Sequence, residues 1–517
     1  WGTFVTTPEV SDDEATVVIE TTVENHAPQP NAVDVEVEIL DPDGRAIDRH
    51  ISPLEIDAGG SQTATVTFRL VAPRRWDIDS PNLYTAVTRV TSADDLLDTA
   101  ETPFGIRTFE FTADDGFHLN GRRVQLYGVN LHHDLGPLGT AFNVRAMQRQ
   151  LEIMQDMGVN ALRTSHNPPA PEVLDLCDRM GIVVWDEVFD KWDATATRPQ
   201  DVSIVEHGWK QIPQMIRRDR NHPSVVVWSV GNEVWDLELG KYEDGPDLLR
   251  QMVEAAKSID TTRPVSLGLC VPDSAKTELS AALDVAGWNY ARRYAISRER
   301  WPELPIIYSE SGSALSTRGY YFLPHPEAKD DYSPEVRISS YDHNSASYSD
   351  IADTEFALME QDRFVAGEFV WTGFDYLGEP YPYYAEGWGA FQKRQLTPAE
   401  TSRSSSFGIV DLVGIPKDRY YLYRSHWAPE KTTIHVLPHW NWPERVDQNV
   451  PVYVYTNGDS AELFINGVSQ GRRSKDPSAK NVMDRYRLRW EDTVYEPGEV
   501  RAVAYRSDRV LGEASVR

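Results

Sequence analysis

The sequence predicts a multidomain α/β plus all-β fold, in which a central (β/α)8 barrel is flanked by two immunoglobulin-like β-sandwiches. Residues 1–108 and 428–517 alternate apolar and polar residues with the period of two that is typical of β-strands. Residues 109–427 instead alternate apolar strand-like runs with amphipathic helical stretches. Eight such strands over roughly 300 residues are typical of a TIM barrel.

The first segment shows the period-two pattern most clearly. Its alternating runs are 15–24, 32–40, 63–70 and 84–90. Asp41-Pro-Asp-Gly44 and Ala58-Gly-Gly-Ser61 are turn signals between them. These features predict a small β-sandwich of immunoglobulin type, with a structural role. Runs 450–456 and 461–465, each followed by an Asn-Gly turn, predict a second β-sandwich at the other end of the chain.

The middle segment contains the predicted barrel. Its strands are expected at 125–132, 160–165, 182–188, 225–233, 264–269, 285–290, 305–311 and 365–376. Helices are expected at 143–157, 171–180, 204–220, 247–259, 351–363 and 418–427. In the first of these helices Met147, Leu151 and Met154 recur at helical spacing. The last helix is displaced by a long loop, 378–406, which is rich in Tyr, Gly and Ser.

The composition argues against several classes of protein. The chain has 51 Lys plus Arg and 80 Asp plus Glu, and its formal net charge of −29 would repel the phosphates of a nucleic acid. It contains no run of 18 or more apolar residues, so no membrane span is expected. Cys177 and Cys270 are expected to be buried thiols, with neither a disulfide framework nor a zinc spacing. A homo-oligomer is compatible with these numbers.

The start of the chain does not indicate a compartment. The sequence opens at Trp1 with no Met, basic segment or apolar leader, which indicates a mature start or a truncation. The compartment is therefore not readable, although a periplasmic or secreted location is favoured over a cytoplasmic one.

Two glutamates each close an apolar strand-like run. Glu233 ends the run that begins at residue 225, and Glu310 ends the run that begins at residue 304. In the predicted barrel these are strands four and seven, which lie across the mouth, so the two carboxyl groups are expected to face one another at the rim. Two convergent carboxyl groups can hydrolyse a glycosidic bond, one as proton donor and the other as nucleophile. Two unrelated surface glutamates are the alternative.

Other polar and aromatic residues also end predicted strands. A sugar presents hydroxyl groups on all sides, so its pocket needs donors and acceptors from several strands and an apolar wall. The candidate substrate-binding residues are His132, Arg163, His166, Asn167, Asp186, Asn232, Tyr290, Trp371 and Glu379. Each alone is more often a buried polar group or a core aromatic residue. Together at one rim they predict a carbohydrate pocket, with Trp371 as the apolar wall.

These residues lie in runs that resemble the signature motifs of glycoside hydrolase family 2. The runs are Gly128-Val-Asn-Leu-His132, Arg163-Thr-Ser-His-Asn-Pro-Pro169, Trp185-Asp-Glu187, Arg218-Asp-Arg-Asn-His-Pro-Ser224, Gly231-Asn-Glu233 and Ser309-Glu310. Segments 369–380 and 406–418 resemble the β-galactosidase branch of that family in particular. The resemblance covers the whole chain, as a sandwich, a barrel and a second sandwich.

The resemblance implies a role for each matched residue. Glu233 would be the general acid/base, Glu310 the nucleophile, and Asn232 would hold the sugar 2-hydroxyl. In the same way, His132 and His166 would bind hydroxyl groups, Tyr290 would lie beside the nucleophile, and Trp371 would be the sugar platform. The implied activity is that of a retaining exo-β-glycosidase. A β-galactosidase that releases terminal galactose from oligo- or polysaccharides by double displacement is favoured.

Three departures from the family pattern affect these expectations. The best-known β-galactosidases carry Glu-x-His after the Asp-Glu of strand three as magnesium ligands, whereas this chain has Lys191 and Asp193 there. Since an ammonium group repels a cation, no cofactor is expected at this place, and a structural or activating cation elsewhere stays open. Ser313 replaces a histidine three residues past the nucleophile. The jelly-roll domain that normally begins the family does not precede Trp1, so either the chain is clipped or the pocket closes differently.

Several alternatives remain open at this stage. A β-glucuronidase would need basic residues facing the sugar carboxylate, and the chain has no Asn-x-Lys run at the expected pocket edge. A β-mannosidase has less support. A non-catalytic carbohydrate-binding protein would be expected to lose one carboxylate, and a scaffold of sandwich modules would not need rim histidines. The aromatic loop 378–406, with Tyr381, Trp388 and Phe391, would add subsites for a galactan or be a plain surface loop.

Overall fold

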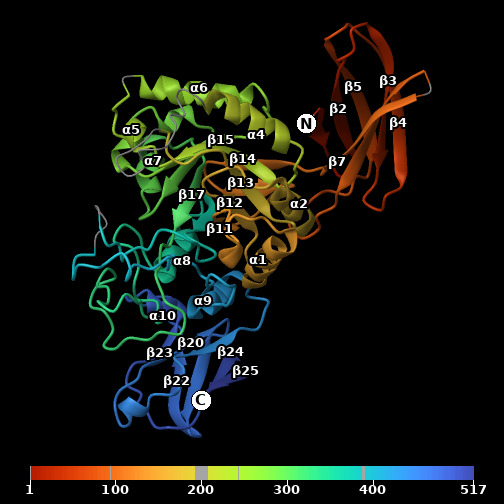
Figure 1. Ribbon diagram of the computed structural model, residues 1–517. Coiled ribbons are helices and arrows are strands. Elements are labelled where there is room, and N and C mark those ends of the chain that lie inside the picture. Colours follow the sequence, from red (N-terminus) through yellow and green to blue (C-terminus); the bar gives the residue numbers. More distant parts are fainter. Residues whose placement is uncertain (1, 94, 193–207, 243, 387–390) are drawn as a thin grey trace. The chain divides into compact units, whose positions relative to one another are not determined.

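The computed structural model describes residues 2–93, 95–192, 208–242, 244–386 and 391–517. Eight strands, β11 to β18, close into a barrel in their order along the chain, and antiparallel sheets precede and follow them in sequence (Figure 1). This topology confirms the predicted fold class. The chain divides into two compact units, which are described separately: unit 1 comprises residues 1–125, 166–287 and 296–306, and unit 2 comprises 126–165, 288–295 and 307–517.

The barrel is built from buried strands and the helices that follow them. The strands are β11 (Leu126–Leu131), β12 (Ala161–Thr164), β13 (Val183–Glu187), β14 (Val225–Asn232), β15 (Val265–Leu269), β16 (Ala286–Asn289), β17 (Ile306–Ser311) and β18 (Val365–Val370). The helices are α1 (Val144–Met157), α2 (Pro171–Met180), α4 (Gln211–Asp219), α5 (Trp235–Glu238), α6 (Gly245–Lys257), α7 (Tyr294–Arg300), α8 (Ala352–Gln361) and α9 (Asp418–Trp427). Short 3-10 turns lie at Gly136–Leu138, Gly208–Lys210, Pro272–Lys276 and Ser280–Ala282. All strand residues except Tyr127 are buried, which explains their continuous apolar runs.

Helix α1 illustrates how local sequence sets the bounds of an element. The side chain of Asn143 accepts a hydrogen bond from the backbone N–H of Ala146 at 3.0 Å and so caps the first turn. Gly158 ends the helix in the left-handed region, with φ at 106°. A Cβ atom at Gly158 would also lie 2.7 Å from the carbonyl carbon of Trp427 in α9, so both the backbone angle and the packing require glycine. Helix α1 therefore begins and ends where its capping residues predict.

Every barrel strand is shorter in the structure than predicted, by one or two residues in each case except β18, which is six residues shorter. Strand β18 ends at Val370 rather than at residue 376, and the N–H of Trp371 just beyond it still donates to the carbonyl oxygen of Ser311 in β17 at 2.9 Å. Strand β16 ends at Asn289, because the three residues from Tyr290 to Arg292 adopt left-handed φ angles of 58°, 52° and 55°. Helix α7 was not predicted. Of the helix predicted at 204–220, residues 204–207 lie outside the described residues, and α4 begins at Gln211.

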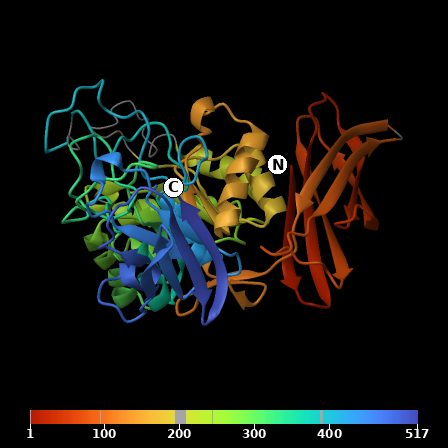
Figure 2. The same ribbon diagram turned by 90° about the horizontal axis from the view of Figure 1, so that it is seen from below.

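The N-terminal segment forms the predicted two-sheet sandwich (Figure 2). Its sheets have the orders β1-β2-β5 and β4-β3-β6-β7, from β1 (Thr3–Val10), β2 (Glu14–Glu24), β3 (Asn31–Leu40), β4 (Ala46–Ile56), β5 (Ser61–Val71), β6 (Tyr84–Ser92) and β7 (Asp95–Phe104). Alternate residues of β2, β3 and β5, such as Ile19, Val37 and Phe68, form its core. A small sheet of β8 (Phe109–Thr112), β9 (Gly116–Leu119) and β10 (Arg122–Arg123) follows.

The C-terminal segment forms a second pair of antiparallel sheets. Their orders are β19-β20-β23 and β22-β21-β24-β25, from β19 (Ile434–Leu437), β20 (Val452–Thr456), β21 (Ser460–Ile465), β22 (Val468–Ser474), β23 (Leu488–Trp490), β24 (Val500–Arg506) and β25 (Arg509–Val516). The segment also holds a 3-10 turn at Pro443–Arg445 and the short helix α10 (Met483–Tyr486). Within the described residues, none of the helices has the length and apolar character of a membrane span.

A buried ion pair attaches the C-terminal sandwich to helix α8 within unit 2. Arg487 donates from Nε to Oδ1 of Asp353 at 2.8 Å, and neither side chain has any exposed surface. The guanidinium also donates from Nη1 to the carbonyl oxygen of Tyr341 at 2.9 Å. Because all of these groups have left water, the geometry must be satisfied completely to offset the cost of desolvation.

We therefore predict that Arg487→Met destabilises the protein by about 3–5 kcal/mol, since it leaves the Asp353 carboxylate buried without its guanidinium partner. The measurement is urea unfolding followed by circular dichroism. Arg501→Met is the matched control, because Arg501 pairs with Glu513 at 2.9 Å on the exposed face of the same sandwich. The control should change stability by less than about 1 kcal/mol. Equal effects of the two substitutions would contradict the prediction.

Candidate functional site

Residues at the ends of β13 and β14 form the first group of candidates, which lies in unit 1 and is called the Glu233 group. Glu233 directly follows β14, with a left-handed φ of 46° and its N–H donating to the carbonyl oxygen of Gly268 at 2.8 Å. Asn232 donates from Nδ2 to Oδ1 of Asp190 at 3.2 Å, and the same nitrogen lies 3.5 Å from Nε2 of His166. The amide of Asn232 and the imidazole of His166 therefore lie side by side, and Asn232 directly precedes Glu233 in the chain.

The imidazole of His166 is oriented by a buried carboxylate. Nδ1 of His166 lies 2.6 Å from Oε1 of Glu187, and the Ser229 hydroxyl donates to Oε2 of Glu187 at 2.8 Å. The predicted substrate-binding residues included Asp186 but not Glu187, although both lie within β13 and are buried. Strand alternation could have indicated that only one of two neighbours faces His166.

Asn167 is placed differently from the rest of the group. Its side chain is exposed, and Nδ2 donates to the carbonyl oxygen of Pro168 at 3.0 Å. It lies in the turn after β12, one residue beyond His166. In this structure Asn167 therefore supports the turn, and its predicted contact with a substrate stays a prediction.

Of the two positions that replace the usual magnesium ligands, the described one carries an ammonium group. The Nζ atom of Lys191 lies 2.8 Å from Oδ1 of Asp190 and 3.7 Å from Oε2 of Glu233. An ammonium group so close to these carboxylates would repel a second cation. Asp193, the other position of the motif, lies outside the described residues.

One other cluster among the described residues has the spacing of metal ligands. Its members are Asp175, Asp178 and His222, whose ligand atoms all lie within 4.8 Å of one another. Asp178 already binds Nδ1 of His222 at 2.6 Å and accepts the N–H of Ser224 at 3.0 Å. These bonds account for the cluster as a structural support of the turn before β14.

Unit 2 holds the second group of candidates, called the Glu310 group. Glu310 lies in β17 with 2 % of its surface exposed. Nη1 of Arg163 donates to Oε1 of Glu310 at 2.8 Å, and the Tyr290 hydroxyl donates to Oε2. The backbone N–H of Tyr290 also donates to the carbonyl oxygen of Glu310 at 2.7 Å. A cation and a hydroxyl donor on one carboxylate both favour its ionised form.

Arg163 has a different place from the one the sequence suggested. It was expected to bind substrate at the rim, but its side chain has no exposed surface and lies in β12. Besides Glu310, it binds Oδ1 of Asn130 and the carbonyl oxygen of Ser309, both at 3.1 Å. Asn130, which the sequence analysis did not select, donates in turn to the carbonyl oxygen of Phe369 at 2.9 Å. Arg163 therefore supports the carboxylate in this structure.

Aromatic side chains lie together after β11 and β18 in the same unit. The ring of His132 is 5.2 Å from that of Trp371, edge to face, and 4.2 Å from that of Tyr376. The Tyr376 hydroxyl donates to Glu379. Tyr376, which was not among the predicted site residues, therefore contacts the predicted residues His132 and Glu379. Trp371 is 4 % exposed, which makes it a wall of this group more than an open platform.

The described part of loop 378–406 packs onto this aromatic wall. Its residues Tyr383, Phe391 and Leu396 belong to one buried cluster with Trp371 and Tyr290. The loop is therefore a packed layer over the described residues, and its use as a sugar subsite stays a prediction. Trp388, named with this loop, lies outside the described residues.

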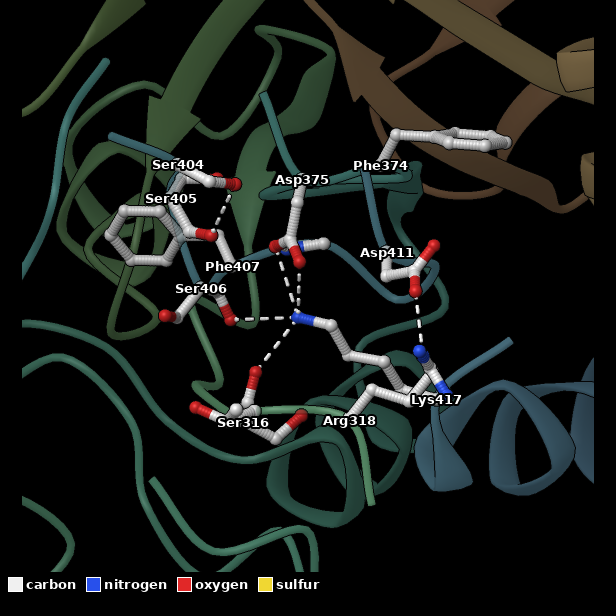
Figure 3. Close-up of polar contacts among 12 residues, drawn as sticks. Ser316, Arg318, Phe374, Asp375, Ser404, Ser405, Ser406, Phe407, Asp411 and Lys417 are labelled. Atoms are coloured by element: carbon white, nitrogen blue, oxygen red, sulfur yellow. Dashed lines mark hydrogen bonds and ion pairs between the residues drawn. The ribbon is translucent and has the colours of Figure 1, made fainter. Parts of the chain in front are cut away.

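The buried side chain of Lys417 binds groups from several of the segments around this aromatic cluster (Figure 3). The Nζ atom of Lys417 lies 2.8 Å from Oδ2 of Asp375 and donates to the carbonyl oxygens of Ser316 at 2.8 Å and Ser406 at 3.3 Å. Lys417 is 1 % exposed. Asp375 follows Trp371 by four residues and Ser316 follows Glu310 by six, so one ammonium group joins the chain after β17 to the chain after β18.

Two buried carboxyl groups lie behind the Glu310 strand. Glu368 accepts the Ser311 hydroxyl at 2.6 Å, and Glu355 accepts the Tyr308 hydroxyl at 3.3 Å. Burial, together with the neighbouring Glu368, raises the pKa of Glu355 to about 8. Burial also raises the pKa of Glu368 to about 7. Glu355 therefore holds its proton in the folded protein at neutral pH, whereas Glu368 is divided between its protonated and ionised forms there.

The chain belongs to glycosyl hydrolases family 2. Residues 111–407 match the family's TIM barrel domain, residues 2–107 match a second domain of the same family, and residues 447–512 match a domain of unknown function. These matches confirm the resemblance inferred from the signature motifs.

Individual relatives bear the names of more than one activity. The chain is 39% identical to beta-galactosidase BoGH2A of Bacteroides ovatus over 557 residues, which cover 100% of this chain and 62% of that protein. It is 27% identical to a beta-glucuronidase of Bacteroides fragilis, covering 99% of this chain and 72% of the relative. A crystal structure of a beta-glycosidase from Bacteroides vulgatus aligns with a TM-score of 0.83 at 28% identity, over 100% of this chain and 64% of that one.

From the two raised pKa values we predict that stability falls with pH. The unfolded chain loses these protons near pH 4.5, whereas the folded protein keeps them up to about 7 and 8, so their contribution is complete below 4.5 and is lost as pH rises through 7–8. Urea unfolding between about pH 5 and 9 should show a decline of a few kcal/mol. Glu355→Gln should flatten that decline relative to wild type, and parallel curves for the two proteins would contradict it.

A second prediction concerns the buried pair of Figure 3. Lys417→Met leaves the Asp375 carboxylate without its cation and should destabilise the protein by about 3–5 kcal/mol. Adding Asp375→Asn removes the orphaned charge and should recover part of the loss. Thermal unfolding of the two single variants and the double variant measures this coupling. If the double variant is as unstable as the sum of the singles, the pair is not a coupled unit.

Proposed function

We propose that this chain is the catalytic part of a retaining exo-β-glycosidase that acts on terminal β-galactosides. The observation that carries the proposal is Glu310, a carboxylate enclosed in β17 and held by Arg163 at 2.8 Å and by the Tyr290 hydroxyl. Membership of the family and 39% identity to a protein named a beta-galactosidase support it. The chain spans 62% of that relative's length.

In the first step Glu310 attacks the anomeric carbon of the sugar. A nucleophile must be ionised, and the Arg163 guanidinium supplies a permanent positive charge that favours this form. Glu233, protonated at this stage, donates its proton to the leaving oxygen. The products of this step are a covalent glycosyl-enzyme on Glu310 and the released alcohol.

In the second step Glu233 acts as a base. Its carboxylate takes a proton from water, and that water attacks the anomeric carbon and frees Glu310. Asn232 holds the 2-hydroxyl through an amide that Asp190 orients at 3.2 Å. Because the hydrogen bond to the 2-hydroxyl strengthens in the transition state, Asn232 contributes to rate more than to binding.

Galactose is favoured over glucuronic acid as the sugar released. Support for galactose comes from the beta-galactosidase relative and from the strand-eight motif that led to the same expectation. The beta-glucuronidase relative, at 27% identity, makes the glucuronide the second candidate. A glucuronide would need a cation facing the sugar carboxylate, so the two candidates can be separated by substrate alone.

A panel of 4-nitrophenyl β-glycosides tests the proposal. Release of nitrophenol from the galactoside and not from the glucuronide, mannoside or glucoside supports it, and release from the glucuronide alone would replace galactose by glucuronic acid. Glu310→Gln should lower turnover by at least a hundredfold, because an amide is not a nucleophile. Glu303→Gln, an exposed glutamate just before β17, is the control and should keep full activity.

Trapping identifies the nucleophile directly. A 2-deoxy-2-fluoro galactoside should add one sugar to the intact protein, and mass spectrometry of the digest should place it on the peptide that contains Glu310. A label on another peptide would contradict the assignment, as would more than a few per cent of activity in Glu310→Gln.

A further inference from the structure

The side chain of Lys191 lies beside the carboxyl group to which we assign the proton transfer. Its Nζ atom is 3.7 Å from Oε2 of Glu233 and 2.8 Å from Oδ1 of Asp190. The two carboxyl-bearing side chains and the lysine are each only partly exposed, at 17 % for Glu233, 12 % for Asp190 and 20 % for Lys191. Water therefore screens the attraction between Lys191 and Glu233 less than it would screen an ion pair on the open surface.

The backbone on both sides of Lys191 is attached to β14, the strand that ends next to Glu233. On one side the N–H of Asn232 donates to the carbonyl oxygen of Asp190 at 3.0 Å. On the other side Nε1 of Trp192, which is fully buried, donates to the carbonyl oxygen of Val230 at 2.8 Å. The lysine is therefore held at a set distance from Glu233 by neighbours that bind the same strand.

Gly231 permits this attachment. A Cβ atom at residue 231 would lie 2.6 Å from Nε1 of Trp192, a distance that side chains do not tolerate. The glycine of the Gly-Asn-Glu motif thus lets the segment carrying Lys191 approach the segment carrying Glu233. The arrangement uses local packing within unit 1 and needs no added ion.

We infer that Lys191 is a positioning residue for Glu233 and supplies the positive charge that a divalent cation would otherwise bring to this carboxyl group. The inference rests on the proposed function, because it assigns proton donation to Glu233. As the proton leaves for the glycosidic oxygen, negative charge develops on the Glu233 carboxyl group. The ammonium group at 3.7 Å attracts that charge more strongly in the transition state than in the protonated ground state.

The nearby acidic groups do not remove this effect. Asp190 shares the ammonium group, but it also accepts the Nδ2–H of Asn232 at 3.2 Å. Glu238, in α5, accepts the N–H groups of Cys270 at 2.9 Å and Val271 at 2.7 Å, and burial raises its pKa to about 7. Near neutral pH Glu238 is therefore only partly ionised, so it offsets only part of the positive charge that Lys191 places beside Glu233.

The test is the dependence of activity on the leaving group. Cleavage of phenyl β-galactoside needs a proton donor, because phenolate is a poor leaving group. Cleavage of 2,4-dinitrophenyl β-galactoside needs little protonation, because dinitrophenolate is a good leaving group. Lys191→Met should lower kcat/KM at least tenfold for the phenyl substrate and less than about threefold for the dinitrophenyl substrate. Lys191→Arg, which keeps the charge, should restore most of the loss. Wild-type activity should be unchanged by a chelator or by added magnesium.

The matched control is Lys241→Met. Lys241 pairs with Asp236 at 2.5 Å in the same unit but is 61 % exposed, and its removal should affect neither substrate. Thermal unfolding of each variant identifies a folding defect, which would lower both activities equally. An equal loss on both substrates, or activity that a chelator abolishes, overturns the inference while the proposed function stands. A wild type that cleaves no glycoside overturns both.

Discussion

The pairing of Glu310 with Arg163 is the interaction on which the Glu310 group depends. A carboxylate that is 2 % exposed in a barrel strand has lost its hydration, a cost of several kcal/mol in a protein interior. Arg163 offsets that cost through Nη1 at 2.8 Å, and the same nitrogen also donates to Oδ1 of Asn130 and to the carbonyl oxygen of Ser309. The left-handed backbone at Tyr290 brings a hydroxyl and an N–H group to the same glutamate.

The two candidate carboxyl groups have contrasting environments. Glu310 is enclosed and paired with a guanidinium, which stays charged at any pH of interest, whereas the side chain of Glu233 is 17 % exposed and lies beside a more distant ammonium group. The first environment suits a group that must stay ionised. The second suits a group that must gain and lose a proton in each cycle, because water and protons reach it. The contrast supports the division of roles that the proposed mechanism needs.

The supporting residues show a common principle. Glu187 orients His166, Asp190 orients Asn232, and Lys417 joins the segments after β17 and β18. In each case a charged side chain with little exposed surface makes at least one hydrogen bond to a group more than twenty residues away in the sequence. Such supports set the orientation of a functional side chain to within a fraction of an ångström, which packing alone does less well.

Much of this protein could be predicted from its sequence. The fold class followed from the switch between period-two and helical patterns. Most strand and helix bounds agreed within two residues, because capping residues such as Asn143 and Gly158 of α1 are recognisable in the sequence. Glu233, Asn232, His166 and Glu310 were recognised as polar side chains at or near strand ends. Their family was recognised from the same motifs.

What the sequence could not determine was the partner of each side chain. Arg163, Asn130 and Glu187 are polar residues inside buried strands, and whether such a residue contacts a substrate or a neighbouring strand depends on distances between segments far apart in the chain. The end of β16 was equally hidden, because its left-handed backbone from Tyr290 to Arg292 is formed by residues other than glycine. The sequence by itself determined which elements form and which side chains lie at their ends. The tertiary structure decided which charges meet, because the free energy of a buried ion pair depends on the separation of its two charges.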